Sequence, residues 1–300
     1  MSAAGTSRRW YGDGVDLDAL WDFGDPAASE QRFRAALADA DGEDAAVLRT
    51  QLGRALGLQR RFDEADKELS AVDPGDSALA AAYLAIERGR MLRSSGDTAA
   101  ARPFFISALE RAEAAGLDFL AADAAHMLAI AESGEAQVPW AERALRIAQS
   151  SDDPRARRWV GPVTHNLGWT THGLGRYDEA LRYFEQALAF RLAQGDPEPI
   201  KVARWAVARC LRTLGRYDEA LAIQRELRQS GPGAGYIDEE LGELLLVTGQ
   251  PEAASPHFAA AHRLLSGDAW LVAEEPERLR RLAELSGEHL SGEHLGADLL

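Results

Sequence analysis

The heptapeptide Gly-Arg-Tyr-Asp-Glu-Ala-Leu occupies residues 175–181 and recurs unchanged at residues 215–221. A looser copy, Arg-Arg-Phe-Asp-Glu-Ala, lies at residues 60–65. Repetition at a period of 20 to 50 residues is typical of folds in which each unit is one supersecondary element, stacked on the next. The heptapeptide therefore sets a register in which the rest of the chain can be aligned.

Six units share this register, and each is centred on one anchor residue. The anchors are Leu52, Arg88, Leu128, Leu167, Val207 and Leu241, which are 34 to 40 residues apart. A glycine or alanine follows every anchor directly, and an alanine stands thirteen residues after it. Four residues after that alanine, a large residue follows in every unit: Leu69, Phe105, Leu145, Phe184, Gln224 and Phe258. Since small residues let two helices approach closely, each unit is predicted to be a pair of packed helices.

A turn is expected eight residues after each anchor. Four of the six units have glycine there, at Gly96, Gly175, Gly215 and Gly249, whereas Arg60 and Ala136 occupy the other two positions. Glycine readily adopts the left-handed conformation that ends many helices. At the start of the chain, Asp25 followed by Pro26 has the pattern of a helix N-cap and first turn.

These units resemble tetratricopeptide repeats, and residues 166–187 carry the small-residue, Gly-x-Tyr and Ala…Phe…Ala pattern in order. The resemblance covers roughly residues 46 to 265. It implies an all-α, right-handed superhelical solenoid of stacked antiparallel helix pairs, with about six repeats and partial caps. It also implies a concave groove that binds a protein or peptide.

The predicted organisation has a solenoid over residues 16–285. Its repeats start near residues 46, 82, 122, 161, 201 and 235. A half-repeat cap is expected over residues 16–40 and a capping helix over residues 270–285. Disorder is expected for residues 1–15 and for residues 286–300, where His289 and His294 lie in a duplicated Ser-Gly-Glu-His-Leu segment rich in polar residues.

Charge and composition exclude several classes of function. The chain has 33 Lys+Arg against 48 Asp+Glu, a net charge of -15, which disfavours nucleic acid and anionic membranes as partners. It has no apolar run of the ~20 residues that a membrane span needs, and no signal-peptide pattern, so we expect a cytoplasmic protein. Cys210 is the single cysteine, and we interpret it as a packed structural residue.

Candidate binding residues lie two before, two after and five after each anchor, on one face of the first helix. In the resembled family this face lines the groove. The polar and aromatic residues there are Arg54, Arg90, Arg93, His126, His165, Trp169, His172, Trp205, Arg209, Arg212, Glu239 and Glu243. Asn166 matches one position of the family's clamp for C-terminal carboxylates. Two interpretations remain open: the arginines bind an acidic segment, or they pair with carboxylates on adjacent helices.

The predicted function is therefore a protein- or peptide-binding adaptor or scaffold, with an acidic segment as the candidate ligand. The alternative is a regulator that senses a short peptide or small molecule. An enzyme is not expected, because no nucleophile with a base and no cofactor motif can be found. We expect no metal, since His165 and His172 are ~10 Å apart along a helix and one zinc cannot bind both. A homodimer is possible.

Overall fold

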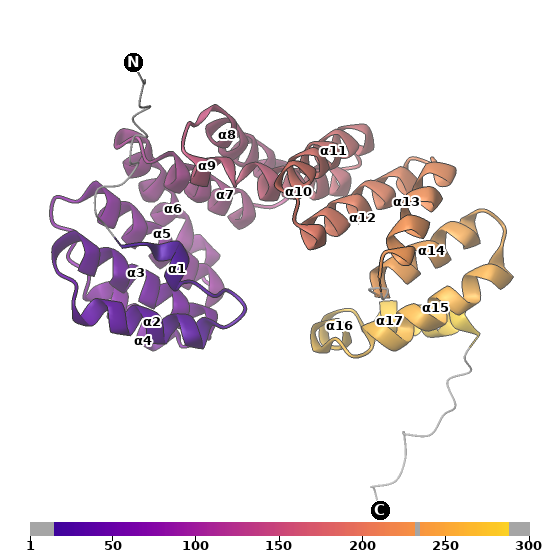
Figure 1. The fold of residues 1–300 in the computed structure, drawn as a ribbon, viewed down its shortest axis with the longest axis horizontal. Helices are drawn as coiled ribbons and strands as arrows, with labels where there is room; N and C mark the ends of the chain where they lie inside the picture. The colour runs from indigo at the N-terminus through magenta and orange to yellow at the C-terminus, as the bar shows by residue number, and fades with distance from the viewer. Residues whose placement is uncertain (1–14, 232–234, 288–300) are drawn as a thin grey trace, which may run out of the picture. The chain divides into compact units, whose positions relative to one another are not determined.

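The computed structural model describes residues 15–231 and 235–287, and within these residues all regular structure is helical (Figure 1). The predicted all-α helical repeat fold is thus confirmed. The chain divides into two compact units, Met1–Leu174 and Gly175–Leu300, which we describe separately. The expectations for residues 1–14 and 288–300, His289 and His294 among them, fall outside the described residues. Within residues 15–231 and 235–287, no helix has the length and hydropathy that crossing a bilayer requires.

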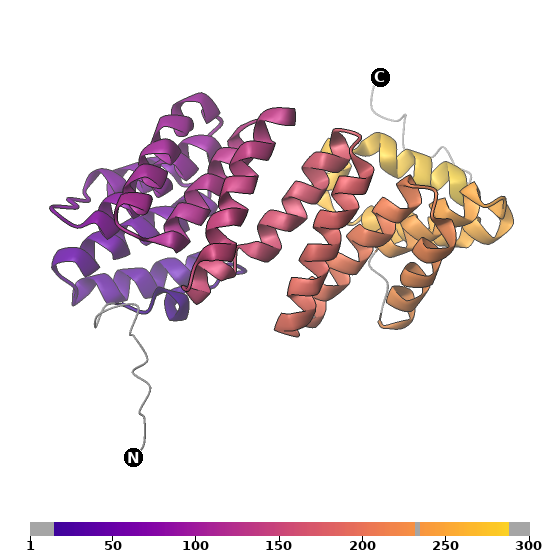
Figure 2. The ribbon, with the colours of Figure 1, turned by 90° about the horizontal axis from the view of Figure 1, so that it is seen from above.

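Both units consist of helices that pack on their sequence neighbours (Figures 1 and 2). The N-terminal unit contains α1 (Leu17–Leu20), α2 (Pro26–Ala38), α3 (Gly42–Leu58), α4 (Phe62–Ser70), α5 (Ala78–Ser94), α6 (Thr98–Ala114), α7 (Asp118–Ala131), the 3-10 turn η1 (Gly134–Ala136), α8 (Gln137–Ser150), α9 (Pro154–Arg157) and α10 (Val160–Gly173). The C-terminal unit contains α11 (Tyr177–Gln194), α12 (Pro197–Thr213), α13 (Tyr217–Gln229), α14 (Gly235–Val247), α15 (Pro251–Leu265), α16 (Ala269–Glu274) and α17 (Pro276–Ser286).

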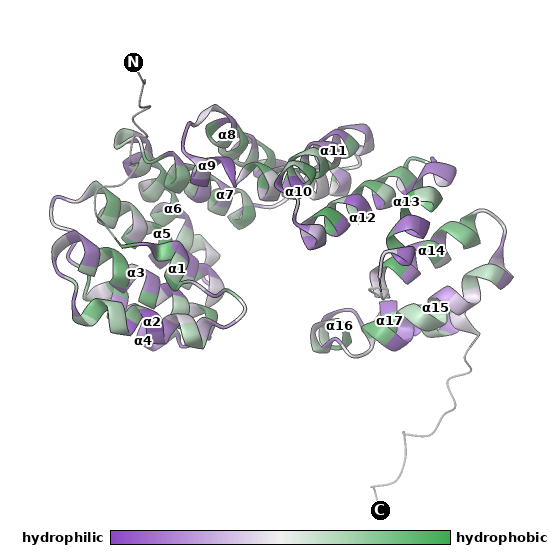
Figure 3. Cartoon of the chain, viewed as in Figure 1, coloured by the Kyte–Doolittle hydropathy of each residue, from purple (hydrophilic) through white to green (hydrophobic). Residues whose placement is uncertain are grey.

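Close approach at the small residue after each anchor joins the two helices of a repeat. A Cβ built on Gly89 of α5 would lie 2.4 Å from the ring of Phe105 on α6. The same construction on Gly242 would lie 2.8 Å from Phe258. Phe105 is fully buried. Most residues of α7 are buried too, and apolar residues predominate in that helix (Figure 3). The pairing of a small residue with a large one is therefore what sets the distance between paired helices.

Five of the six turn positions adopt the left-handed conformation that the repeat pattern predicted. Gly96, Gly215 and Gly249 have φ values of 102°, 76° and 76°. Arg60, which replaces glycine in the first unit, has φ 60° and is the one non-glycine residue with positive φ among the described residues. Ala136, which replaces glycine in the third unit, instead has φ -67°, and the positive φ of 54° there belongs to Gly134. The repeat register therefore predicts the left-handed conformation at Arg60 but not at Ala136.

Helix starts agree with their capping residues. The Asp25 side chain accepts a hydrogen bond of 2.9 Å from the backbone N–H of Ala28, and Pro26 opens α2 as predicted. Ser77 caps α5 in the same way, at 3.0 Å from the backbone nitrogen of Ala80. These bonds satisfy backbone donors that the first turn of a helix leaves without a partner.

Gln224 on α13 occupies the column that holds a large apolar residue in the other units. Its side chain is fully buried, and neither its amide oxygen nor its nitrogen has a hydrogen-bond partner among the described residues. In this unit the residue after the anchor is Ala208. The third unit also has an alanine after its anchor, Ala129, and its residue in the apolar column is Leu145. Leucine is therefore the apolar residue that fits this site best.

We expect Gln224→Leu to stabilise the protein by about 1–3 kcal/mol, because it removes two buried polar atoms that lack partners. Urea unfolding followed by circular dichroism measures this gain. Gln229→Leu at an exposed position of the same helix is the control and should leave the free energy of unfolding unchanged. A loss of stability in Gln224→Leu would contradict the interpretation.

Candidate functional site

A hollow of about 1210 Å³ opens in the N-terminal unit, and we call it the N-terminal hollow. The first helices of successive repeats line it in a regular way. The residues nine and five positions before the first four anchors all belong to its wall: Glu43, Val47, Leu79, Tyr83, Phe119, Asp123, Arg158 and Pro162. One repeated stripe of helix surface on α3, α5 and α7, continued into the start of α10, thus forms a single continuous wall.

The segment before α2 supplies a further wall with two aromatic rings. Trp21 and Phe23 stack with ring centroids 4.6 Å apart, and the indole N–H of Trp21 donates to Oε1 of Gln51 at 3.0 Å. The guanidinium of Arg54 lies 5.2 Å from the Trp21 ring centroid and 5.1 Å from that of Phe23. Phe23 nevertheless remains 61% exposed. Such exposure of a large apolar ring in a concave wall favours contact with a ligand.

Contacts at both ends hold this segment in place. Leu17 and Trp21 pack against the buried cluster that includes Phe33 and Leu52. The carboxylate of Asp18 forms an ion pair of 2.8 Å with Arg158, which follows α9 and is 140 residues away in sequence. Because both of these charged side chains are largely exposed, the apolar packing contributes more to holding the segment than the ion pair does.

A second aromatic pair lies on α5 and α7. The rings of Tyr83 and Phe119 are 6.0 Å apart, and the Arg155 guanidinium lies 3.9 Å from the centroid of Phe119. Trp159, at the start of α10, adds a ring that lies 5.1 Å from the imidazole of His126. Burial lowers the pKa of His126 below its ordinary value, and the positive charges of Arg90 and Arg93 act in the same direction. His126 is therefore uncharged near neutral pH.

Arg90 is engaged by two carboxylates of its own unit. It forms ion pairs with Glu87, at 2.5 Å, and with Asp123. Burial alone would lower the pKa of Arg90, but Asp123 and Glu87 outweigh this effect and raise it. Arg93 is half-buried on the last turn of α5. The two candidate arginines of α5 therefore do not line the N-terminal hollow, whereas Arg54 of α3 does.

The candidates on α10 form a cluster along one helix. The indole N–H of Trp169 donates to Nε2 of His165 at 3.0 Å, and the ring of His172 lies 5.7 Å from that of Trp169. Asn166 is half-buried beside them in sequence. None of the four belongs to the wall of the N-terminal hollow. No group of three or more His, Cys, Asp or Glu suited to a metal occurs within the described residues.

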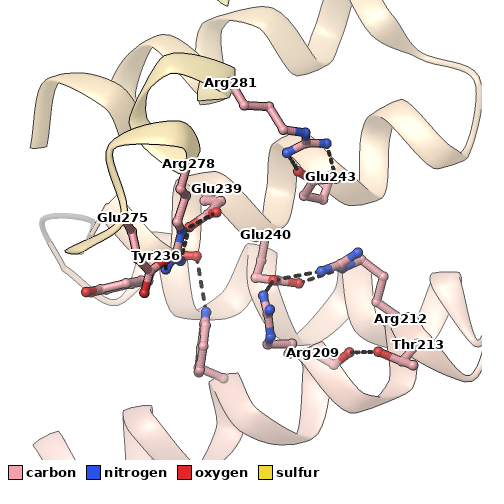
Figure 4. A network of polar contacts seen from close by, with 11 residues as sticks. Arg209, Arg212, Thr213, Tyr236, Glu239, Glu240, Glu243, Glu275, Arg278 and Arg281 are labelled. Atoms are coloured by element: carbon pink, nitrogen blue, oxygen red, sulfur yellow. Dashed lines mark hydrogen bonds and ion pairs between the residues drawn. The ribbon is translucent and has the colours of Figure 1, made fainter. Parts of the chain in front are cut away.

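The C-terminal unit has a smaller hollow of about 350 Å³ whose wall is entirely charged (Figure 4). Arg209 and Arg212 both reach the buried carboxylate of Glu240, with Arg212 at 2.8 and 3.0 Å. Arg278 of α17 pairs with Glu239, and Arg281 pairs with Glu243. Trp205 donates its indole N–H to the backbone oxygen of Tyr236 at 3.1 Å. Ion pairs therefore connect α12 and α17 to α14.

Most candidate arginines form ion pairs within their own unit. Arg90, Arg209 and Arg212 pair with carboxylates on their own or adjacent helices, which is the internal pairing that the sequence left open. The structure brings Arg209, Arg212, Glu239 and Glu243 together around one hollow. Sequence reasoning missed the aromatic residues of the other hollow, namely Trp21, Phe23, Tyr83, Phe119 and Trp159. It also missed Glu275, Arg278 and Arg281 around the smaller hollow.

Cys210 has the properties of a structural cysteine. It is fully buried on α12, and its Sγ donates to the backbone oxygen of Tyr177 at 3.4 Å. Burial raises the pKa of its thiol to about 11. Because the thiolate is the reactive form, Cys210 is unreactive at neutral pH.

Comparisons with known proteins agree with this architecture. Residues 138–193 match the family model described as Tetratricopeptide repeat. A search of curated proteins finds no match to the chain. The fold is similar to that of a Signal Transduction ATPase with Numerous Domains protein with a tetratricopeptide repeat sensor from Pyrococcus horikoshii. That similarity has a TM-score of 0.68 at 14% identity, over 86% of this chain and 41% of that chain.

Two further structures resemble the chain over most of their own length. The apo form of RapI has a TM-score of 0.66 at 12% identity and covers 89% of this chain and 84% of that chain. NprR in complex with its cognate peptide NprX has a TM-score of 0.53 at 14% identity, over 93% of this chain and 84% of that chain. At these identities the likeness concerns the fold alone. Residues 138–193 thus match the tetratricopeptide repeat model in sequence, and the helical repeat fold of the chain is similar to that of structures with such repeats.

Proposed function

We propose that the chain is an adaptor or scaffold that binds a protein or peptide segment in the N-terminal hollow. The observation that carries this proposal is the repeated stripe of residues nine and five positions before each of the first four anchors, which forms one continuous wall. A volume of about 1210 Å³ is larger than most small-molecule sites and suits several residues of a peptide. The peptide complex of NprR, which has a similar fold, is consistent with such a role.

The aromatic residues of the wall are suited to anchoring a peptide. Large rings provide contact area at a low cost in side-chain entropy, and they are enriched among residues that dominate binding energies. Here Trp21, Phe23, Tyr83, Phe119 and Trp159 all belong to one wall. Arg90, Arg209 and Arg212 do not support the preference for an acidic segment that the sequence suggested, because they are paired with carboxylates.

A peptide selection tests this function. Short random peptides displayed on phage are panned against the full chain, and the enriched peptides are titrated by calorimetry. We expect Phe23→Ala to weaken their binding about tenfold, since it removes an exposed ring from the wall. Trp270→Ala is the matched control, because Trp270 is 59% exposed, much like Phe23 at 61%, but lies on α16 outside the wall.

Two outcomes would contradict the proposal. One is equal affinity of the enriched peptides for the wild type and for a folded Phe23→Ala variant, with folding checked by circular dichroism. The other is a selection that enriches no peptide at all, whereas a thermal-shift screen finds a stabilising small molecule. That second outcome would favour the ligand-sensing regulator instead.

A further inference from the structure

We infer that the segment bound in the N-terminal hollow is cationic, with Lys or Arg next to an aromatic or apolar residue. This inference rests on the proposed function, because it specifies the ligand of the same site. It is the opposite of the acidic preference expected from the sequence. The reason lies in the charges of the wall and in how many of them are already paired.

Carboxylates outnumber cations in this wall. Six acidic residues belong to it, namely Asp16, Asp18, Asp41, Glu43, Asp44 and Asp123. The basic residues of the wall are Arg54, Arg155 and Arg158. The surplus is therefore three negative charges, which favours a positively charged ligand in this hollow.

The arginines of the wall already have carboxylate partners. Arg155 pairs with Asp153 at 2.5 Å, and Arg158 pairs with Asp18 at 2.8 Å. Arg54 lies between the aromatic rings and 3.8 Å from the buried Glu87. An acidic ligand would have to compete with these carboxylates for each arginine.

Four carboxylates of the wall, by contrast, have no cation within ion-pair distance among the described residues. These are Asp16, Asp41, Glu43 and Asp44. Asp16 accepts a hydrogen bond from the backbone N–H of Ala19, and Glu43 accepts one from the hydroxyl of Ser77. Asp41 is the N-cap residue of α3, but its side chain makes no capping hydrogen bond. Asp41 and Asp44 are thus the groups best able to receive a cation.

These carboxylates also have an ordinary structural role at the start of α3. Negative charge at a helix N-terminus is favourable, by about 0.3–1 kcal/mol per group. That interaction offsets part of the local negative potential but forms no ion pair. Because the exposed face of Phe23 lies in the same wall, a cation and its apolar neighbour would both find partners there.

Two synthetic probes separate the alternatives. One is a capped hexapeptide of alternating Arg and Trp, and the other is its counterpart of alternating Glu and Trp. Both are titrated by calorimetry against the full chain at about 0.1 M salt, where distant surface charges are largely screened. We expect the Arg-Trp peptide to bind at least about tenfold more tightly than the Glu-Trp peptide.

Charge-removal variants locate the effect. We expect Asp41→Asn with Asp44→Asn to weaken Arg-Trp binding about fivefold, as the loss of two partly exposed ion pairs predicts. The control is Asp63→Asn with Asp66→Asn, which removes the same charge from exposed positions of α4 outside the wall. This control should change the affinity by less than about twofold.

Three results would overturn the inference, and one of them would also overturn the proposed function. Tighter binding of the Glu-Trp peptide, still sensitive to Phe23→Ala, would leave the site in place and reverse its charge preference. Equal losses in the two double variants would assign the effect to the net charge of the chain. If neither probe binds and the peptide selection also enriches nothing, the proposed function itself fails.

Discussion

Replacing Phe105 with alanine is expected to lower the free energy of unfolding by about 4 kcal/mol. Phe105 is fully buried on α6, and its ring lies against Gly89 of α5, so truncation leaves a cavity at the contact between the two helices. Urea unfolding measures the loss. A change below about 1 kcal/mol would show that this contact does not determine how the helices of a repeat pack.

Gly89 allows a stricter form of this test. In the wild type, Gly89→Ala places a Cβ 2.4 Å from the ring of Phe105, and we expect it to destabilise the protein by about 1–2 kcal/mol. In the Phe105→Ala background the ring is absent, so the same change should stabilise by about 0.5–1 kcal/mol through helix propensity alone. Gly57→Ala on α3 is the control, because nothing lies within 4 Å of its Cβ, and it should stabilise both backgrounds.

Replacing Glu240 with alanine is expected to cost about 3 kcal/mol, the second large effect. The carboxylate of Glu240 is fully buried and accepts hydrogen bonds from Arg209 and Arg212. Its removal leaves two partly buried guanidinium groups without their shared partner. Urea unfolding of the variant gives the size of the loss.

The control for Glu240→Ala is Glu226→Ala on α13. Glu226 also pairs with an arginine, Arg204, but its side chain is 63% exposed, so its removal should cost at most about 1 kcal/mol. Equal losses in the two variants would show that burial of Glu240 does not increase the contribution of its ion pairs to the free energy of unfolding. It would then be reasonable to consider Arg209 and Arg212 available to a ligand after all.

Much of the fold could be predicted from the sequence, because each repeat is specified by residues at fixed, short spacings along the chain. The small residue after each anchor and the large residue of the second helix meet in space as expected, as Gly89 and Phe105 show. The turn was predictable at Arg60, which takes the left-handed conformation of its column, but not at Ala136, which has φ -67°. Gln224 was recognisable as a departure from its column, although only the structure shows that its amide has no partner within residues 15–231 and 235–287.

The wall of the N-terminal hollow was not predicted, for a reason that lies in helix length. The predicted repeats start near residues 46, 82 and 122, whereas α3, α5 and α7 begin at Gly42, Ala78 and Asp118, one helical turn earlier. That extra turn carries Glu43, Leu79 and Phe119. The candidate face of each first helix was read only from two residues before the anchor onward. Extending that face two turns toward the N-terminus would have included these residues.

Other parts of the two sites depend on contacts between residues far apart in sequence. The position of Phe23 follows from the packing of residues 15–23 on α2 and α3, and no periodicity specifies it. The same holds for Arg278 and Arg281, which reach Glu239 and Glu243 from the last helix. In an acidic, arginine-rich chain each arginine could pair with any of several carboxylates. The sequence therefore does not specify which of these ion pairs form.

The central claim is that the N-terminal hollow receives a peptide, and photo-cross-linking tests it most directly. The Arg-Trp hexapeptide carries a photoreactive group, and mass spectrometry locates the cross-linked residues. The account predicts cross-links within the segments that form the wall, at residues 15–23, 41–54, 79–83, 119–123 and 158–162. Cross-links concentrated instead on α12, α14 and α17 around the charged hollow would contradict it.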